Sequence, residues 1–209
     1  MTSEMFSLYA ITDRKWLKEK TLENQVKEVL KGGATTLQLR EKTLSFDDFL
    51  EYALKLKPIC QKYKVPFIIN DRVDIAIAAD ADGVHVGQSD QKAQEVRELL
   101  PPEKILGVSC TTVDQALKAQ HHGADYLGVG TMFPTETKAD AETASFDTLI
   151  EIVKAVSIPV VAIGGIRLDN VHLFKKTGID GVAVISSIFA TDDVQRATRQ
   201  LKEEVNMIL

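Results

Sequence analysis

The sequence predicts an α/β fold, a single-domain (β/α)8 barrel that spans residues 1–209. Three observations indicate this architecture. Apolar runs of strand type alternate with helix-period segments along the chain, and the runs are apolar almost throughout, as in strands buried on both faces. Eight such units fill 209 residues and leave no room for a second domain or a linker. An open, doubly wound sheet remains the alternative, although no G-x-G-x-x-G follows the first strand.

The strands are expected at apolar runs bounded by turn residues. Pro66 and Pro159 stand at strand starts, where a sheet tolerates proline. Gly33, Gly123 and Gly178 each follow a helical segment and lead straight into a strand, as helix-capping glycines do. The expected strands are, in order, Phe6–Thr12, Thr35–Glu41, Pro66–Asp71, Gly83–Gln88, Ile105–Cys110, Asp125–Phe133, Ile158–Gly165 and Gly181–Ser186.

The segments between the strands show the spacing of amphipathic helices. Leu22, Val26 and Val29, for example, fall on one face of a helix. Pro58 lies inside the second of these segments and predicts a kink or a split there. The expected helices are Leu22–Lys31, Phe46–Tyr63, Val73–Ala79, Gln91–Leu100, Val113–His122, Ser145–Val156, Leu168–Lys176, a short extra one at Ser186–Ala190, and Asp192–Asn206.

Composition and charge exclude several classes of protein. Lys and Arg total 25 and Asp and Glu total 30, a net charge of −5, so a surface built to bind nucleic acid is not expected. The longest uncharged stretch, residues 155–166, is too short for a membrane helix, and no secretory signal is recognisable near the first residues. Cys60 and Cys110 fit neither a disulfide framework nor a metal-binding pair. We therefore expect a cytoplasmic protein with small-molecule partners and no membrane association, while a homo-oligomer stays open.

Polar residues gather where the predicted strands end, and this asymmetry is the main indication of an enzyme. Barrel enzymes carry their chemistry at the C-terminal ends of the strands. The opposite ends carry mainly turn residues. The polar and glycine residues at the C-terminal ends are Gln38, Arg40, Glu41, Lys42, Asn70, Asp71, Gln88, Asp90, Ser109, Thr135, Thr137, Lys138, Gly164, Gly165, Ser186 and Ser187.

The second strand carries a glutamine and two cations on one face. Alternation places Gln38, Arg40 and Lys42 on one face of the strand and Leu37 and Leu39 on the other. If that face is the barrel interior, its cations need internal carboxylates or an anionic ligand, because buried unpaired charges are costly. A structural salt-bridge layer with Glu41 and its neighbours is the alternative.

Two aspartates, Asp71 and Asp90, end neighbouring strand units. Beside cations that suit phosphates, such a pair indicates a hard divalent ion, since magnesium usually takes one or two carboxylates with waters and phosphate oxygens. Alternatively, each aspartate caps the helix that follows it, at Val73 and at Gln91.

The later strand ends suit a second anionic group. Thr135, Thr137 and Lys138 lie in a long loop, the kind that often forms a lid or a binding loop. Gly164–Gly165 and the short helix at Ser186–Ala190 lie where such barrels often bind phosphate through backbone N–H groups. A solvated lysine, tight turns and a helix cap are the alternatives.

No catalytic triad is recognisable. His85 lies within a strand, and His121, His122 and His172 lie on helices or at their ends. None of them is spaced recognisably from a strand-end serine or cysteine, so they are predicted to be structural. Cys110 is predicted to be a small packing residue.

Taken together, the motifs closely resemble the thiamine-phosphate synthase family. The resemblance is collinear from Tyr9 to Phe189. The matching motifs are Gln38–Lys42, Asn70-Asp71, Gly83–Gln88 with Asp90, Gly107–Ser109, Pro134–Lys138, Ala162–Ile166 and Ile185-Ser186.

The resemblance implies an enzyme that couples hydroxymethylpyrimidine diphosphate with hydroxyethylthiazole phosphate, or its carboxylated tautomer, to give thiamine monophosphate and pyrophosphate. It implies one Mg²⁺ per active site, held by Asp71 and Asp90. The residues implied to bind the pyrimidine diphosphate are Gln38, Leu39, Arg40, Glu41, Lys42, Asn70, Ser109 and Lys138, with Arg40, Lys42 and Lys138 also catalytic. Those implied to bind the thiazole phosphate are Thr135, Glu136, Thr137, Gly165, Ile185 and Ser186.

Two positions depart from the family pattern. Thr131 stands where proline is frequent, and Arg72 follows Asp71 where a second aspartate is frequent, which is expected to change the charge near the metal. A metal and three cations would neutralise a departing diphosphate. Ionisation before attack by the thiazole nitrogen would need no strong general base. The related thiazole tautomerase and a non-catalytic, phosphate-binding regulatory barrel are the alternatives, which the complete set of cations and carboxylates disfavours.

Overall fold

The computed structural model describes residues 3–88, 90–135 and 143–209, and these form a closed barrel of parallel strands, β1 to β8 in order, with β8 paired to β1. The predicted TIM barrel is thus confirmed, and the open sheet is wrong. Most strands are one to four residues shorter than predicted, because the polar residues at their ends belong to loops. The strands are β1 (Leu8–Ile11), β2 (Thr36–Leu39), β3 (Phe67–Asn70), β4 (Gly83–Val86), β5 (Ile105–Cys110), β6 (Tyr126–Val129), β7 (Val160–Ile163) and β8 (Gly181–Val184).

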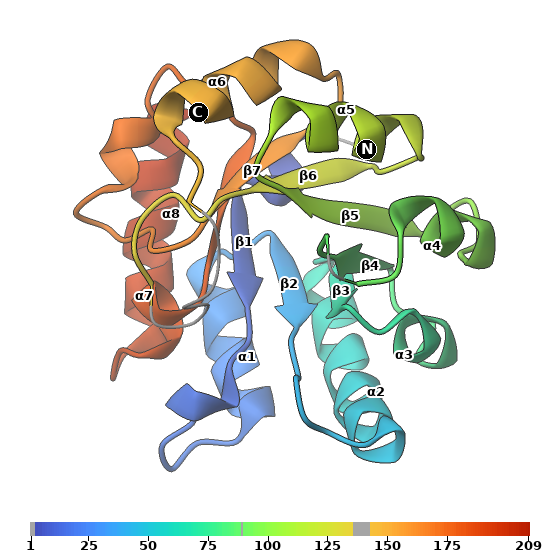
Figure 1. Cartoon of the computed structure of the whole chain (residues 1–209). Helices are drawn as coiled ribbons and strands as arrows, with labels where there is room; N and C mark the ends of the chain where they lie inside the picture. Colours follow the sequence, from blue (N-terminus) through green and yellow to red (C-terminus); the bar gives the residue numbers. More distant parts are fainter. Residues whose placement is uncertain (1–2, 89, 136–142) are drawn as a thin grey trace.

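Helices surround the strands on the outside (Figure 1). They are α1 (Leu22–Gly32), α2 (Phe46–Tyr63), α3 (Val73–Ala78), α4 (Ala93–Leu99), α5 (Val113–His121), α6 (Phe146–Ala155), the short α7 (Ser186–Phe189) and α8 (Val194–Ile208). Within the described residues, none of them is long and apolar enough to cross a membrane.

Two helix predictions were wrong in part. Helix α2 continues through Pro58 without a split, because its buried face of Phe49, Leu56 and Cys60 packs on the barrel on both sides of the proline. The segment expected as a helix at Leu168–Lys176 forms only a single 3-10 turn, Val171–Phe174. There the side chain of Asn170 accepts from the Arg167 N–H at 2.8 Å and donates to the Gly165 carbonyl at 3.0 Å, and such local bonds compete with helix formation.

The apolar residues form two separate layers. Alternate strand residues such as Leu37 and Leu39 point outward and pack against the helices. The residues between them point inward and form a second cluster, in which Phe6 stacks on Tyr126 at 4.5 Å between ring centres. The inner cluster consists of Phe6, Tyr9, Ile11, Ile68, Ile105, Tyr126, Val161 and Ala183.

Candidate active site

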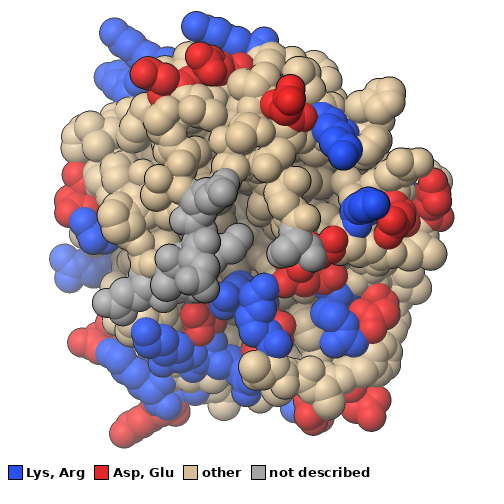
Figure 2. All heavy atoms as spheres, viewed as in Figure 1, with Lys and Arg blue, Asp and Glu red and all other residues tan. Residues whose placement is uncertain are grey.

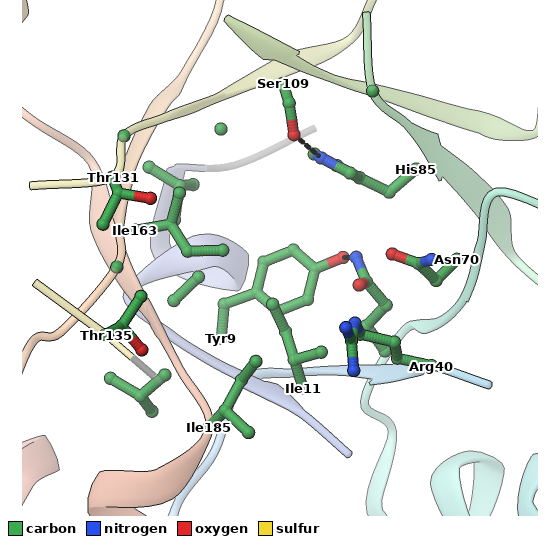
Figure 3. Close-up of a pocket in the computed structure, with 18 of the residues that line it drawn as sticks. Tyr9, Ile11, Arg40, Asn70, His85, Ser109, Thr131, Thr135, Ile163 and Ile185 are labelled. Atoms are coloured by element: carbon green, nitrogen blue, oxygen red, sulfur yellow. Dashed lines mark hydrogen bonds between the residues drawn. The ribbon is translucent and has the colours of Figure 1, made fainter. Parts of the chain in front are cut away.

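A cavity of about 840 Å³ opens at the C-terminal ends of the strands, a volume in the range of about 300–1,000 Å³ that small-molecule sites occupy. Figure 3 shows side chains from around the barrel pointing into it. Of the predicted site residues, those that line it are Gln38, Arg40, Lys42, Asn70, Asp71, Asp90, Ser109, Thr135, Gly165, Ile185 and Ser186. The predicted residues Glu136, Thr137 and Lys138 lie outside the described part of the chain.

The end of β2 shows the predicted alternation. Gln38, Arg40 and Lys42 face the cavity. Leu39 and Glu41 do not line it, and their assignment to the pyrimidine diphosphate stays a prediction. Leu39 is fully buried in the outer layer, because the strand pleat turns it toward the helices.

Glu41 is instead held by a cation outside the cavity. The Nε of Arg14 donates to both Glu41 carboxylate oxygens, at 2.8 and 2.9 Å. Burial raises the pKa of the Glu41 carboxyl, and the neighbouring Arg14 opposes that rise. Glu41 therefore pairs with Arg14 rather than with a cavity cation. Both cavity cations nevertheless lie beside other carboxylates, so the alternative of a salt-bridge layer of Glu41 and its neighbours is not overturned.

The two cavity cations have different partners. Lys42 Nζ lies 2.5 Å from an oxygen of Asp71. The Arg40 guanidinium lies 3.8 Å from an oxygen of Asp13, too far for a hydrogen bond. Figure 2 shows basic and acidic side chains side by side on the face viewed in Figure 1. Arg40 thus faces the cavity, and its contact with Asp13 does not use its N–H groups for a hydrogen bond.

Asp71 and Asp90 do not cap helices, so that alternative is wrong. Helix α3 begins after Arg72, and the Asp71 backbone, at φ +62°, donates its N–H to the His85 carbonyl at 2.8 Å. Helix α4 begins later than predicted, at Ala93, while the Asp90 carboxylate accepts from the Gly87 N–H at 2.6 Å. Both residues line the cavity.

The two carboxylates also interact with each other. Burial raises the pKa of Asp90 above its usual range, the Gly87 N–H opposes that rise, the Asp71 carboxylate adds to it, and Lys42 lowers it. The described ranges contain no cluster of three or more His, Cys, Asp or Glu residues suited to a metal. A cation at Asp71 and Asp90 would therefore need further oxygen ligands from a substrate or from water.

Arg72 is turned away from this pair. Its guanidinium donates to both carboxylate oxygens of Asp74, at 2.8 and 2.6 Å. The expected effect of Arg72 on the charge beside the carboxylate pair is therefore partly cancelled by Asp74.

Gly164 and Gly165, after β7, have positive φ values of 102° and 63°. The sequence predicted that they let a ligand approach the backbone. The structure adds a second reason: a Cβ on Gly164 would lie 2.5 Å from Thr131 Cγ2, and one on Gly165 would lie 2.8 Å from the carbonyl oxygens of Phe133 and Pro134. The glycines therefore allow the loop after β6 to pack closely over the end of β7.

Asn70 presents an unpaired donor at the cavity. Its side chain is buried, and its Nδ2 has no hydrogen-bond partner within the described structure. A buried donor without a partner is costly. A ligand that accepts this hydrogen bond would remove the cost.

Tyr9, His85 and Tyr126 are among the cavity residues that were not predicted from the sequence. His85 Nε2 lies 2.9 Å from Ser109 Oγ, a pairing that no spacing in the sequence indicated. The pairing arises because β4 and β5 are neighbours with His85 opposite Gly107, which places Ser109 one inward position further along. The signal was the alternation in β4, where Val84 and Val86 face outward and His85 must face inward.

Comparisons with known proteins identify the family. A profile of the family described as thiamine monophosphate synthase matches residues 8–188. The chain belongs to this family. A thiamine-phosphate synthase of Clostridium botulinum is 51% identical over 203 residues, which is 97% of this chain and 95% of the relative. One from Clostridium tetani is 53% identical over 195 residues, 93% of each chain.

A solved structure agrees with this membership. A thiamine phosphate pyrophosphorylase from Pyrococcus furiosus matches with a TM-score of 0.92 and 41% identity, over 99% of this chain and 98% of that one. This member of the thiamine monophosphate synthase family is therefore an enzyme, a transferase of thiamine biosynthesis.

Proposed function

We propose that the cavity joins hydroxymethylpyrimidine diphosphate to hydroxyethylthiazole phosphate, or to its carboxylated tautomer, with release of pyrophosphate. The observation that carries this assignment is the meeting of Arg40 and Lys42 with the carboxylates of Asp71 and Asp90 at one end of the barrel. Such a set suits a diphosphate that leaves with increasing negative charge. The names of the relatives and of the solved structure support the same reaction.

The diphosphate would lie against the ends of β2 and β3. Arg40 and Lys42 would donate to its oxygens, and the unpaired Nδ2 of Asn70 would gain an acceptor. Each contact strengthens as the bridging C–O bond breaks, because negative charge moves onto the departing oxygens. Lys138, outside the described residues, stays a prediction as a further cation.

The carboxylate pair fits one magnesium ion. Asp71 and Asp90 are close enough for the first to raise the pKa of the second, and both line the cavity beside Lys42. A magnesium ion bound there would neutralise charge on the diphosphate oxygens. Lys42 compensates the charge of Asp71 in this structure and would bind the diphosphate beside it.

The thiazole phosphate would lie on the opposite side of the cavity. Figure 3 shows Thr135 and Ile185 across the opening from Asn70. Thr135 supplies a hydroxyl, and the backbone at Gly165, Ile185 and Ser186 lines the cavity there. Glu136 and Thr137 stay predictions for the same subsite. The two substrates would then meet over the barrel centre.

The site favours a dissociative substitution. The C–O bond to the diphosphate breaks first, the aminopyrimidine stabilises the methylene cation, and the thiazole nitrogen then supplies the electron pair of the new C–N bond. This nitrogen carries no proton, so no strong general base is needed. His85 contacts Tyr126 and Ser109 through its two ring nitrogens. A fluorinated, electron-poor pyrimidine should slow the chemical step, and an undiminished rate would contradict this order of events.

The decisive assay supplies both substrates and magnesium and measures thiamine monophosphate and pyrophosphate. We expect both products to appear in equal amounts and a chelator to stop their formation. Isomerisation of the thiazole without coupling would identify a tautomerase, and phosphate binding without turnover would identify a regulatory barrel. Formation of product at the same rate after exhaustive chelation would refute the magnesium site alone.

We place the reaction in the cytoplasm, a setting that the free, buried thiols of Cys60 and Cys110 fit.

A further inference from the structure

A chain of hydrogen bonds crosses the barrel interior and reaches the cavity at both ends. Gln38 Nε2 donates to Tyr9 Oη at 2.9 Å, and Tyr9 Oη lies 2.8 Å from Tyr126 Oη. Tyr126 Oη lies 2.8 Å from His85 Nδ1, and His85 Nε2 lies 2.9 Å from Ser109 Oγ. Five different strands supply these side chains: β2, β1, β6, β4 and β5. Figure 3 shows Tyr9 at the centre of the cavity, with the His85–Ser109 pair beside it.

The middle of the chain is almost fully buried. Tyr9 and Tyr126 are each 1% exposed and His85 is 8% exposed. Burial raises the pKa of both phenols well above their usual range, so each keeps its single O–H proton. Polar groups this deeply buried are held to their hydrogen-bond partners, because an unpaired one is costly.

A direction follows for the chain if each buried N–H and O–H in it has an acceptor and the imidazole is neutral. Tyr9 Oη accepts from the Gln38 amide, so its own proton is the one shared with Tyr126. Tyr126 then donates its proton to His85 Nδ1, which must be the unprotonated ring nitrogen. The neutral imidazole consequently carries its proton on Nε2 and donates it to Ser109 Oγ. Ser109 has accepted this bond, and its hydroxyl proton is left for the cavity.

We propose that Tyr9, Tyr126 and His85 are positioning residues that fix Ser109 as a hydrogen-bond donor toward the pyrimidine substrate. The two ends of the chain are coupled. While Gln38 uses an N–H toward Tyr9, its carbonyl faces the substrate as an acceptor and Ser109 faces it as a donor. Reversing the Gln38 amide would reverse every bond and turn Ser109 into an acceptor.

This coupling selects a substrate by its hydrogen-bonding pattern, an inference that rests on the proposed function. A ring nitrogen next to an exocyclic amine presents an acceptor beside a donor. Ser109 would donate to the ring nitrogen, and the Gln38 carbonyl would accept from the amine. A pyrimidine with an exocyclic oxygen and a protonated ring nitrogen presents the opposite pattern and would be rejected, because buried polar groups would lose their partners.

The direction of the chain can be tested without turnover. We would label the histidine ring nitrogens with ¹⁵N and record which nitrogen of His85 carries the proton. The chain has 4 histidines, and the spectrum of His85→Gln assigns the signal of His85. We expect a neutral ring protonated at Nε2. A ring protonated at Nδ1, or a doubly protonated ring, would overturn the proposed direction whatever the activity of the enzyme.

Kinetics then test whether the chain acts through Ser109. Tyr126→Phe removes one hydroxyl from the chain, and we expect the KM for the pyrimidine diphosphate to rise roughly tenfold, the loss of about one hydrogen bond, with the KM for the thiazole phosphate unchanged. In the Ser109→Ala background the same substitution should add little. Tyr63→Phe, outside the cavity on α2, is the matched control. Equal effects of Tyr126→Phe in both backgrounds, or on both KM values, would refute the positioning role.

These experiments distinguish a failure of the positioning role from a failure of the proposed function. A wild-type enzyme that forms thiamine monophosphate while its His85 carries the proton on Nδ1 would refute the positioning role and leave the proposed function intact. A wild-type enzyme that forms no product would refute the proposed function, and the ¹⁵N result would still report the direction of the chain.

Discussion

Replacing Gly165 by alanine tests how the loop after β6 is held over the thiazole side of the cavity. Gly165 has φ +63°, a conformation that costs an L-residue about 1–2 kcal/mol. The added Cβ would also lie 2.8 Å from backbone oxygens of Phe133 and Pro134, which cannot move as a side chain end can. Overpacking of this kind typically costs about 1–3 kcal/mol. We therefore expect Gly165→Ala to lower the free energy of unfolding by about 2–5 kcal/mol.

Gly33→Ala is the matched control. Gly33 also has a positive φ, of 103°, but its Cβ would meet only the Lys202 side chain, at 3.4 Å. Its expected cost is the backbone term alone, about 1–2 kcal/mol. Urea unfolding of both variants gives the difference. Because Thr135 follows the displaced residues, Gly165→Ala should also raise the KM for the thiazole phosphate, which Gly33→Ala should not.

Two results would refute this reasoning. Equal destabilisation by the two substitutions would show that the contact with Phe133 and Pro134 contributes nothing. An unchanged KM for the thiazole phosphate in a clearly destabilised Gly165→Ala variant would show that the loop position does not affect the thiazole side.

Three further substitutions test the charges. Asp71→Asn should lower kcat roughly 10²–10³-fold with an unchanged circular dichroism spectrum. Asp74 is an exposed neighbour, and the kcat of Asp74→Asn should stay near that of the wild type. Similar losses of kcat in both variants would argue against the metal site. Lys42→Met should lower kcat/KM for the pyrimidine diphosphate roughly 10²-fold, and a change confined to the thiazole phosphate would contradict its placement. Arg14→Met should destabilise the fold by roughly 1–3 kcal/mol at pH 7, because Glu41 stays buried. The pKa of Glu41 is already raised above its usual value of 4.5 in the folded state and would rise further without Arg14. This loss should therefore shrink as the pH falls from 7 toward 4.5, because Glu41 becomes protonated in both folded proteins above its usual pKa, as unfolding at the two pH values would show.

Most of the fold could be predicted because it depends on local patterns. Apolar alternation and helical spacing located the strands, the order of the units and the inward side of β2. The exception at Val171–Phe174 has a local cause, since the side chain of Asn170 binds the backbone that a helix would need. The prediction for α2 was wrong for the opposite reason. Packing of the helix on both sides of Pro58 outweighed the local disruption of the helix by the proline.

The sequence by itself determined the barrel, the alternation that places Gln38, Arg40 and Lys42 on one face, and the gathering of cations and carboxylates at the C-terminal ends of the strands. Only the tertiary structure decided which partner each group has. It paired Glu41 with Arg14, brought Asp71 beside Asp90, and joined Ser109 to His85. The physical reason is range: periodicity is a property of a few neighbouring residues, whereas a hydrogen bond needs about 3 Å between atoms whose residues are far apart in the chain. That distance is set by strand register and loop packing.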